Sequence, residues 1–368
     1  MTKNEKLLNK IVEGVELPES AYTKAKDRYH DLGDWLGREG STCENNDPHV
    51  FSQGSFRLGT AIRPLSENEE YDLDLACNLR EGINAATHSQ RDLKILIGSE
   101  LELYRIARNI KAPLDEKHRC WRLDYADNLS FHMDIVPCIP EEETNRHLLQ
   151  VSMESYGLNE SLAKEAADLA VGITDNRLPH YKIKPSDWQI SNPEGYARWF
   201  QERMQITQGK IMALEKAQVD EIPLYKQKTP LQRAIQILKR HRDQMFKDNT
   251  DSKPISVIIT TISGNNYSGS NNLESTLNEI LAGLNQFMNS GEDILPNPVN
   301  PKENFADRWS MPQYSHLRLK ENFHMWVKAV TRDFDSIKSS TELEFISEAA
   351  SIKFAVNINN EEYFSRAD

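Results

Sequence analysis

The stretch "SQGSFRLGTAIRP" (residues 52–64), followed by "EEYDLDLAC" (69–77), decides the fold. Gly54 and Ser55 predict a turn, and Asp72 and Asp74 stand two positions apart in a β-rich run. Alternate side chains of a strand point to the same face, so the two carboxylates lie together while their apolar neighbours pack on the other face. Carboxylates so close repel each other, and a divalent cation relieves that cost. The pattern therefore predicts a metal ion at this strand.

A third acid lies in another β-like run, "LSFHMDIVPCIP" (129–140), where Asp134 is flanked by apolar residues. A carboxylate inside an apolar strand is unusual unless it is paired or ligates a metal. Asp72, Asp74 and Asp134 together are the ligand type that Mg²⁺ prefers. The alternative is that the D-x-D pattern belongs to a solvated edge strand and has no chemical role.

The Gly-Ser turn is not a Walker-type phosphate loop. "GSFRLGT" (54–60) fits the start of G-x-x-x-x-G-K, but Thr60 follows Gly59 where the lysine is required. Such a turn can still bind a triphosphate, because glycine lets the backbone approach closely while main-chain N–H groups and the Ser55 hydroxyl donate to phosphate oxygens. A simple loop is the other interpretation.

The remaining chain reads as mixed β structure followed by helices. Apolar spacing predicts one or two helices within 3–38 and another at 90–110. "LPNPVNPKEN" (295–304), with three prolines, predicts an irregular connection. The other expected elements are β runs at 50–56, 70–79, 119–124 and 129–137, and helices at 141–172, 194–219, 254–263 and 273–289. Taken alone, "ISVIITTI" (255–262) is also compatible with a strand.

A further helix begins at "TPLQRAIQILKRHRD" (229–243), where Thr229 is a suitable N-cap and Gln232 completes a capping box. Gln232, Gln236 and Lys239 form a polar stripe beside the apolar one. A lysine in that stripe can reach across a cleft toward the other lobe. The alternative is that Lys239 belongs, with Arg240 and Arg242, to a solvated basic face.

Composition limits the class of protein. The 368 residues suffice for two lobes, and four widely spaced cysteines predict reduced thiols rather than disulfides or a zinc site. The N-terminus is too polar for a signal peptide and no apolar run could span a bilayer, so a cytoplasmic location is expected. The net charge of −12 disfavours extended nucleic-acid binding, although residues 226–247 hold seven basic residues against one acid.

The motifs together resemble the polymerase-β-type nucleotidyltransferase superfamily, on "QGS" (53–55), "YDLDL" (71–75) and "FHMDIVP" (131–137). More narrowly, the chain resembles the bacterial cGAS/DncV-like nucleotidyltransferases (CD-NTases) of CBASS anti-phage systems. The later blocks that carry this likeness are "SNPEGYARWF" (191–200), "TPLQRAIQILKRHRD" (229–243), "KPISVIITTI" (253–262) and "NPVNPKENFADRW" (297–309). The cysteine/histidine zinc insertion of the animal DNA sensor is missing from the sequence.

The resemblance implies an α+β, two-lobed fold, with a mixed-sheet catalytic lobe and a helical lobe enclosing a nucleotide cleft. It implies N-terminal helices bracing the lobes over 1–45, a catalytic lobe over 46–190, a helical lobe over 191–345 and a tail over 346–368. Asp72 and Asp74 would bind two Mg²⁺ ions, with Mn²⁺ able to substitute, and Asp134 would bind the catalytic one. The implied nucleotide-binding residues are Gln53, Gly54, Ser55, Lys239 and Ser256.

The implied activity is synthesis of a cyclic di- or trinucleotide second messenger from NTPs, ATP among them, with release of pyrophosphate. The expected partners are a downstream effector that binds the product and a regulatory protein, with no requirement for DNA, RNA or a membrane. A template-independent RNA-tailing enzyme and a catalytically inactive nucleotide-binding module remain as alternatives. Base choice, linkage and ring size stay open at this point.

Overall fold

The structure is a computed structural model that describes residues 2–66, 71–125, 131–205, 228–340 and 342–358. Its main sheet has seven strands in the order β1-β2-β5-β4-β3, and β6 pairs with β5 and β7. Strands β2 and β5 run parallel while their other neighbours run antiparallel, so the sheet is mixed. The strands are β1 (Pro48–Ser52), β2 (Tyr71–Leu79), β3 (Asp115–Glu116), β4 (Trp121–Tyr125), β5 (Phe131–Pro140), β6 (Val171–Ile173), β7 (Gln189–Ser191), β8 (Pro296–Asn297) and β9 (Asn300–Asn304).

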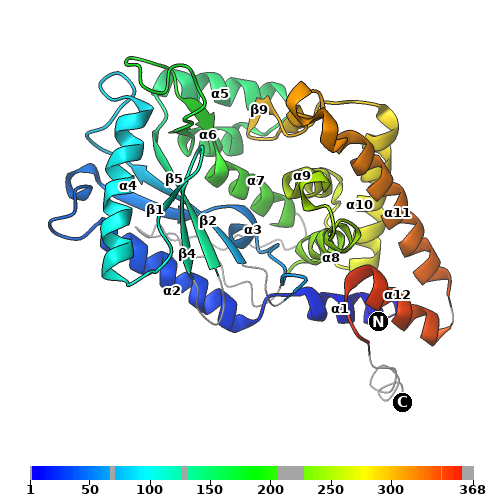
Figure 1. Cartoon of the computed structure of the whole chain (residues 1–368). Coiled ribbons are helices and arrows are strands. Elements are labelled where there is room, and N and C mark those ends of the chain that lie inside the picture. Colours follow the sequence, from blue (N-terminus) through cyan, green and yellow to red (C-terminus); the bar gives the residue numbers. More distant parts are fainter. Residues whose placement is uncertain (1, 67–70, 126–130, 206–227, 341, 359–368) are drawn as a thin grey trace.

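Helices surround the sheet and form a second lobe beside it (Figure 1). They are α1 (Lys3–Val15), α2 (Glu19–Leu36), α3 (Gly54–Arg57), α4 (Gln90–Ala107), α5 (Glu143–Ser155), α6 (Glu160–Asp168), α7 (Pro193–Gln205), α8 (Pro230–Met245), α9 (Ser256–Asn266), α10 (Leu273–Ser290), α11 (Leu319–Ser339) and α12 (Leu343–Phe354). Within the described ranges, each helix is too short or too polar to cross a lipid bilayer.

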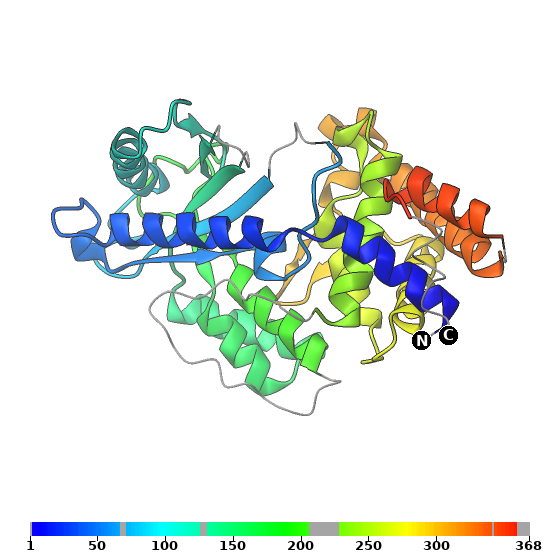
Figure 2. The same ribbon diagram turned by 90° about the horizontal axis from the view of Figure 1, so that it is seen from below.

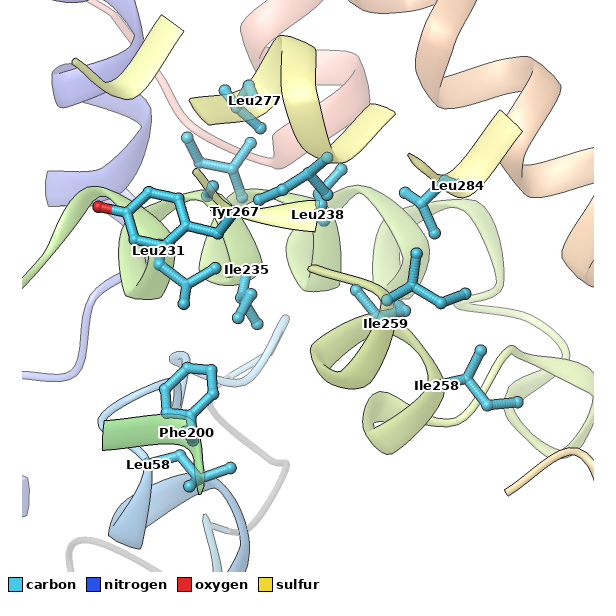
Figure 3. Packing of buried hydrophobic residues seen from close by; sticks show 14 of the residues in the cluster. Leu58, Phe200, Leu231, Ile235, Leu238, Ile258, Ile259, Tyr267, Leu277 and Leu284 are labelled. Atoms are coloured by element: carbon cyan, nitrogen blue, oxygen red, sulfur yellow. The ribbon is translucent and has the colours of Figure 1, made fainter. Parts of the chain in front are cut away.

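The two lobes have separate hydrophobic cores. One packs the apolar face of the sheet against α2 and α4, and includes Leu73 and Met133. The other joins α1 with α5 to α12 and centres on α8, whose Leu231, Ile235 and Leu238 are fully buried (Figure 3). Figure 2 shows α1 and α2 running in succession along the helical lobe and the sheet, so the N-terminal helices contact both.

Most of the expected elements are confirmed, including the helices in 3–38 and at 90–110 and the strands over 70–79 and 119–124. The helix at 229 is also confirmed in detail: Thr229 accepts from the main-chain N–H of Gln232, whose side chain accepts from Thr229 N. The helix expected at 194–219 is present to residue 205, and its remainder lies outside the described residues, as do residues 226 and 227 of the basic segment.

Three expectations are wrong. The strand expected over 50–56 ends at Ser52, because Gly54 adopts a left-handed backbone with φ of +63° and starts α3. The end of the helix expected over 141–172 is strand β6. Residues 295–304 are not an irregular connection but the β8–β9 hairpin. In the part of the chain that the structure describes, these two short strands pair with each other alone, so they tolerate proline at positions that need no N–H donor.

Candidate active site

Pairing in the sheet brings the three predicted carboxylates together. The parallel register of β2 and β5 places Asp74 opposite Asp134 and Asp72 opposite His132. Among the described residues, one oxygen from each of Asp72, Asp74 and Asp134 lies within 4.8 Å of the others. Three convergent carboxylates suit a hard divalent cation, so the donor set fits a metal ion bound by these side chains.

The electrostatics of Asp74 favour a bound cation. Burial, together with the neighbouring carboxylates of Asp72 and Asp134, raises the pKa of this carboxyl to about 8. A metal ion would supply the positive charge that a buried, ionised Asp74 requires.

Two basic side chains that sequence reasoning missed stand beside the carboxylates. Arg122 of β4 donates from Nε and Nη2 to both oxygens of Asp134, each at 2.7 Å. His132 Nε2 lies 3.1 Å from Asp72 Oδ1. The β run at 119–124 was expected, but only the observed pairing of β4 with β5 sets Arg122 opposite Asp134.

The Gly-Ser turn lies directly against the carboxylates. A Cβ atom on Gly54 would be 2.3 Å from Asp74 Oδ2, so a glycine is needed there for steric reasons as well as for its positive φ. The Gln53 main-chain N–H donates to Asp74 O at 2.9 Å, and its side chain donates to Leu75 O at 3.3 Å. Gln53 thus ties the turn to β2, while Ser55 faces a cavity.

Two adjoining cavities meet at this turn. The first, of about 230 Å³, lies between the turn, α7, α9 and the β8–β9 hairpin. The second, of about 380 Å³, reaches Asp72 and basic residues of the α8–α9 region. Ser55, Lys239 and Ser256 line both cavities, so three of the predicted nucleotide-binding residues converge here.

Lys239 is not part of a solvated basic face. Its side chain is buried and donates to the carbonyl of Thr60 at 2.9 Å, and Arg240 and Arg242 are buried as well. Burial, together with the positive charge of Arg242, lowers the pKa of Lys239 to about 7. Arg242 also donates to the Ser256 hydroxyl at 2.9 Å, which fixes that side chain at the start of α9.

The far wall of the first cavity carries a third residue that sequence reasoning missed, Glu303 of β9. Its Oε2 accepts a hydrogen bond from Asn297 Nδ2 at 2.7 Å, and burial raises the pKa of its carboxyl. The ring of Phe305 lines the same wall and contacts Tyr196 edge-on, with ring centroids 5.9 Å apart. The sequence did not indicate this role, because the three prolines predict an irregular connection and not the hairpin that places Glu303 at the cavity.

Comparisons with known proteins agree with this geometry. Residues 48–137 match the family described as "Cyclic GMP-AMP synthase DncV-like, nucleotidyltransferase domain". The chain is 26% identical over 352 residues to a c-di-GMP synthase of Roseivirga ehrenbergii, covering 93% of this chain and 82% of that protein. It is 22% identical over 347 residues to the cyclic dinucleotide synthase CdnG of Bradyrhizobium diazoefficiens, covering 86% and 73%.

Solved structures show the same fold. The CD-NTase CdnG of Bradyrhizobium diazoefficiens in complex with GTP superposes with a TM-score of 0.66 at 19% identity, over 95% of each chain. The apo form of Vibrio cholerae DncV gives a TM-score of 0.66 at 12% identity, over 98% of this chain and 96% of that one. The chain therefore has the two-lobed polymerase-β-like fold of these structures.

Within that fold, residues 48–137 match the DncV-like nucleotidyltransferase domain. The recognition of the chain as a bacterial CD-NTase, made above from "QGS", "YDLDL" and the later blocks, is confirmed.

Proposed function

We propose that this protein is a Mg²⁺-dependent synthase that joins NTPs into a cyclic dinucleotide messenger and releases pyrophosphate. The observation that carries the proposal is the convergence of Asp72, Asp74 and Asp134 within 4.8 Å beside a cavity lined by Ser55 and Lys239. The nature of the product rests on the relatives, which are named as synthases of cyclic dinucleotides.

The protein's residues would act on the donor nucleotide as follows. Gly54 lets the backbone approach the triphosphate, while the Ser55 hydroxyl and the Lys239 ammonium donate to its oxygens. Mg²⁺ held by the three aspartates would neutralise phosphate charge and lower the pKa of the acceptor ribose hydroxyl. The acceptor oxygen forms a bond to the α-phosphorus as the bond to pyrophosphate breaks, and a second such transfer closes the ring.

In the ligand-free arrangement, Arg122 would hold Asp134 toward Asp74. Its two hydrogen bonds fix the carboxylate plane, which orders one metal ligand before the cation binds.

Regulation and biological role belong to the same proposal. We place the enzyme in anti-phage signalling, with an effector that binds the product and a protein partner that controls synthesis. One CdnC relative was solved in complex with a HORMA protein, which supports a protein partner. The net charge of −12 supports independence from DNA and RNA, because an acidic surface repels a phosphate backbone.

The direct test is to incubate nuclease-treated protein with Mg²⁺ and all four NTPs and to read the product masses. We expect a cyclic dinucleotide, with a yield that added duplex DNA or RNA does not change. Long linear products would instead identify an RNA-tailing enzyme, and no release of pyrophosphate would identify an inactive binding module.

Glu303 is proposed to select guanine as a base. Guanine presents two N–H donors on its Watson–Crick edge, which a carboxylate can accept, whereas adenine presents an acceptor at N1. Replacing Glu303→Gln should therefore lower kcat/KM for GTP relative to ATP by roughly tenfold to a hundredfold, the equivalent of one charged hydrogen bond.

The measurement is the ratio of GTP to ATP incorporated under competition. Glu292→Gln serves as the control, because Glu292 is an exposed acid just before the hairpin and lines neither cavity. An unchanged ratio in Glu303→Gln would remove Glu303 from base selection.

A further inference from the structure

The segment that follows the Gly-Ser turn is held by buried polar side chains of α8. Each of them donates to a main-chain carbonyl of residues 58–63, and we call this set of bonds the carbonyl ladder. Its members are Gln232 Nε2 to Leu58 O at 2.9 Å, Lys239 Nζ to Thr60 O at 2.9 Å, Gln236 Nε2 to Ala61 O at 2.8 Å, and Arg240 Nη2 to Arg63 O at 2.6 Å.

The two glutamines differ from Lys239 in what surrounds them. Gln232 and Gln236 have no exposed surface, and neither lines the two cavities of the site. The amide of Gln232 is also oriented from its other end, because its Oε1 accepts from Thr229 N at 2.9 Å in the capping box. The helix cap therefore aims the Gln232 donor at Leu58.

The ladder connects to the phosphate-binding turn by short main-chain bonds. The N–H of Thr60 donates to Ser55 O at 2.9 Å, and the N–H of Leu58 donates to Gly54 O at 3.2 Å. The apolar side chain of Leu58 packs in the core of the helical lobe, near Phe200 and below α8 (Figure 3). Phe56, two residues earlier, belongs to the core of the sheet. The turn is thus anchored in both lobes.

We propose that Gln232 and Gln236 are positioning residues for nucleotidyl transfer. They hold residues 58–61 against α8, and so set the place of the Ser55 hydroxyl and main chain relative to Lys239, without contacting the nucleotide. This inference rests on the proposed function, because it explains what holds the turn and Lys239 of the proposed nucleotide site in place relative to each other. Because the carbonyl ladder supports the turn that would bind phosphate, which all NTPs share, its loss should weaken the binding of every NTP by the same factor.

The test is Gln236→Met, which keeps the length and volume of the side chain and removes the donor to Ala61. We expect KM to rise about tenfold, by the same factor for GTP and for ATP, while kcat stays within about twofold of the wild-type value. A purely structural defect would behave differently, because a partly unfolded sample loses active enzyme and hence apparent kcat while KM stays constant.

Gln244→Met is the matched control. Gln244 lies on the same helix, is half-buried, and takes no part in the ladder, so its KM should equal that of wild type. Equal KM values for the two variants, or a change confined to one base, would overturn the proposal.

Failure of the proposed function would show in the wild-type protein as absence of cyclic product. The ladder would then be tested by calorimetric binding of a non-hydrolysable GTP analogue with Mg²⁺, for which Gln236→Met should bind about tenfold more weakly than Gln244→Met. A wild-type protein that bound no analogue would overturn both the function and the role of the ladder.

Discussion

Replacing Asp72 and Asp74 together with asparagine is expected to abolish product formation, by at least about a thousandfold. The two side chains supply two of the three convergent carboxylates, and a metal-assisted phosphoryl transfer loses several kcal/mol of transition-state stabilisation without its ions. The measurement is pyrophosphate release from NTPs with Mg²⁺ at saturating concentration.

The same double variant should remain folded and gain stability in alkaline solution without metal. The pKa of Asp74 in the folded protein is raised to about 8, well above its ordinary value, so folding favours the protonated carboxyl. Stability is therefore lost as the pH rises from about 4 toward about 8, because in this range Asp74 is ionised in the unfolded chain but still protonated in the folded protein. Asparagine carries no charge, so Tm in the presence of a chelator should exceed that of wild type above pH 8.

Asp115→Asn is the control for charge removal in the same sheet. Asp115 lies on strand β3 at the sheet edge and pairs with Lys117, away from the acidic cluster. It should leave product formation unchanged. Near wild-type rates from the Asp72 and Asp74 double variant would mean that the metal site is elsewhere.

The shared face of Asp72 and Asp74 could be predicted because it depends on local periodicity. Spacing of two residues fixes Asp72 and Asp74 on one face of a strand whatever surrounds it. Asp134 is joined to them by its place in an apolar strand and by the resemblance, while its approach to Asp74 depends on the register of β2 with β5. The capping box at Thr229 also depends only on neighbouring residues, which explains why the predicted N-cap and capping box of α8 are both present in the structure.

Contacts that depend on tertiary register could not be predicted. Arg122 reaches Asp134 only because β4 pairs with β5 in one particular register. Lys239 and its neighbours Arg240 and Arg242 look solvated in a one-dimensional pattern, yet they are buried because main-chain carbonyls and side-chain oxygens of other segments accept from them. A charged stripe on a helix therefore does not indicate whether water or backbone is the partner.

Glycine at position 54 provides the second test with a large expected effect. In Gly54→Ala, a Cβ atom would be placed 2.3 Å from Asp74 Oδ2 and 3.1 Å from its Cγ, a separation that van der Waals radii forbid. Either Asp74 or the turn must move. Because the same carboxylate is a proposed metal ligand, product formation should fall at least about a hundredfold.

The stability that is lost when a non-glycine residue adopts a positive φ must be separated from the effect of the steric clash between the new Cβ and Asp74. Gly40 has φ of +77° and no atom within 4 Å of a built Cβ, so Gly40→Ala carries the backbone cost alone, about 1 kcal/mol. Both variants should lose a similar few degrees of Tm, but only Gly54→Ala should lose activity and affinity for Mn²⁺ used as a metal probe. If the two variants were equally active, the close approach of the turn to Asp74 would have no part in catalysis. The contrast therefore isolates one interatomic contact, between a turn that would bind phosphate and a carboxylate that would bind metal, as the geometric link between the two halves of the site.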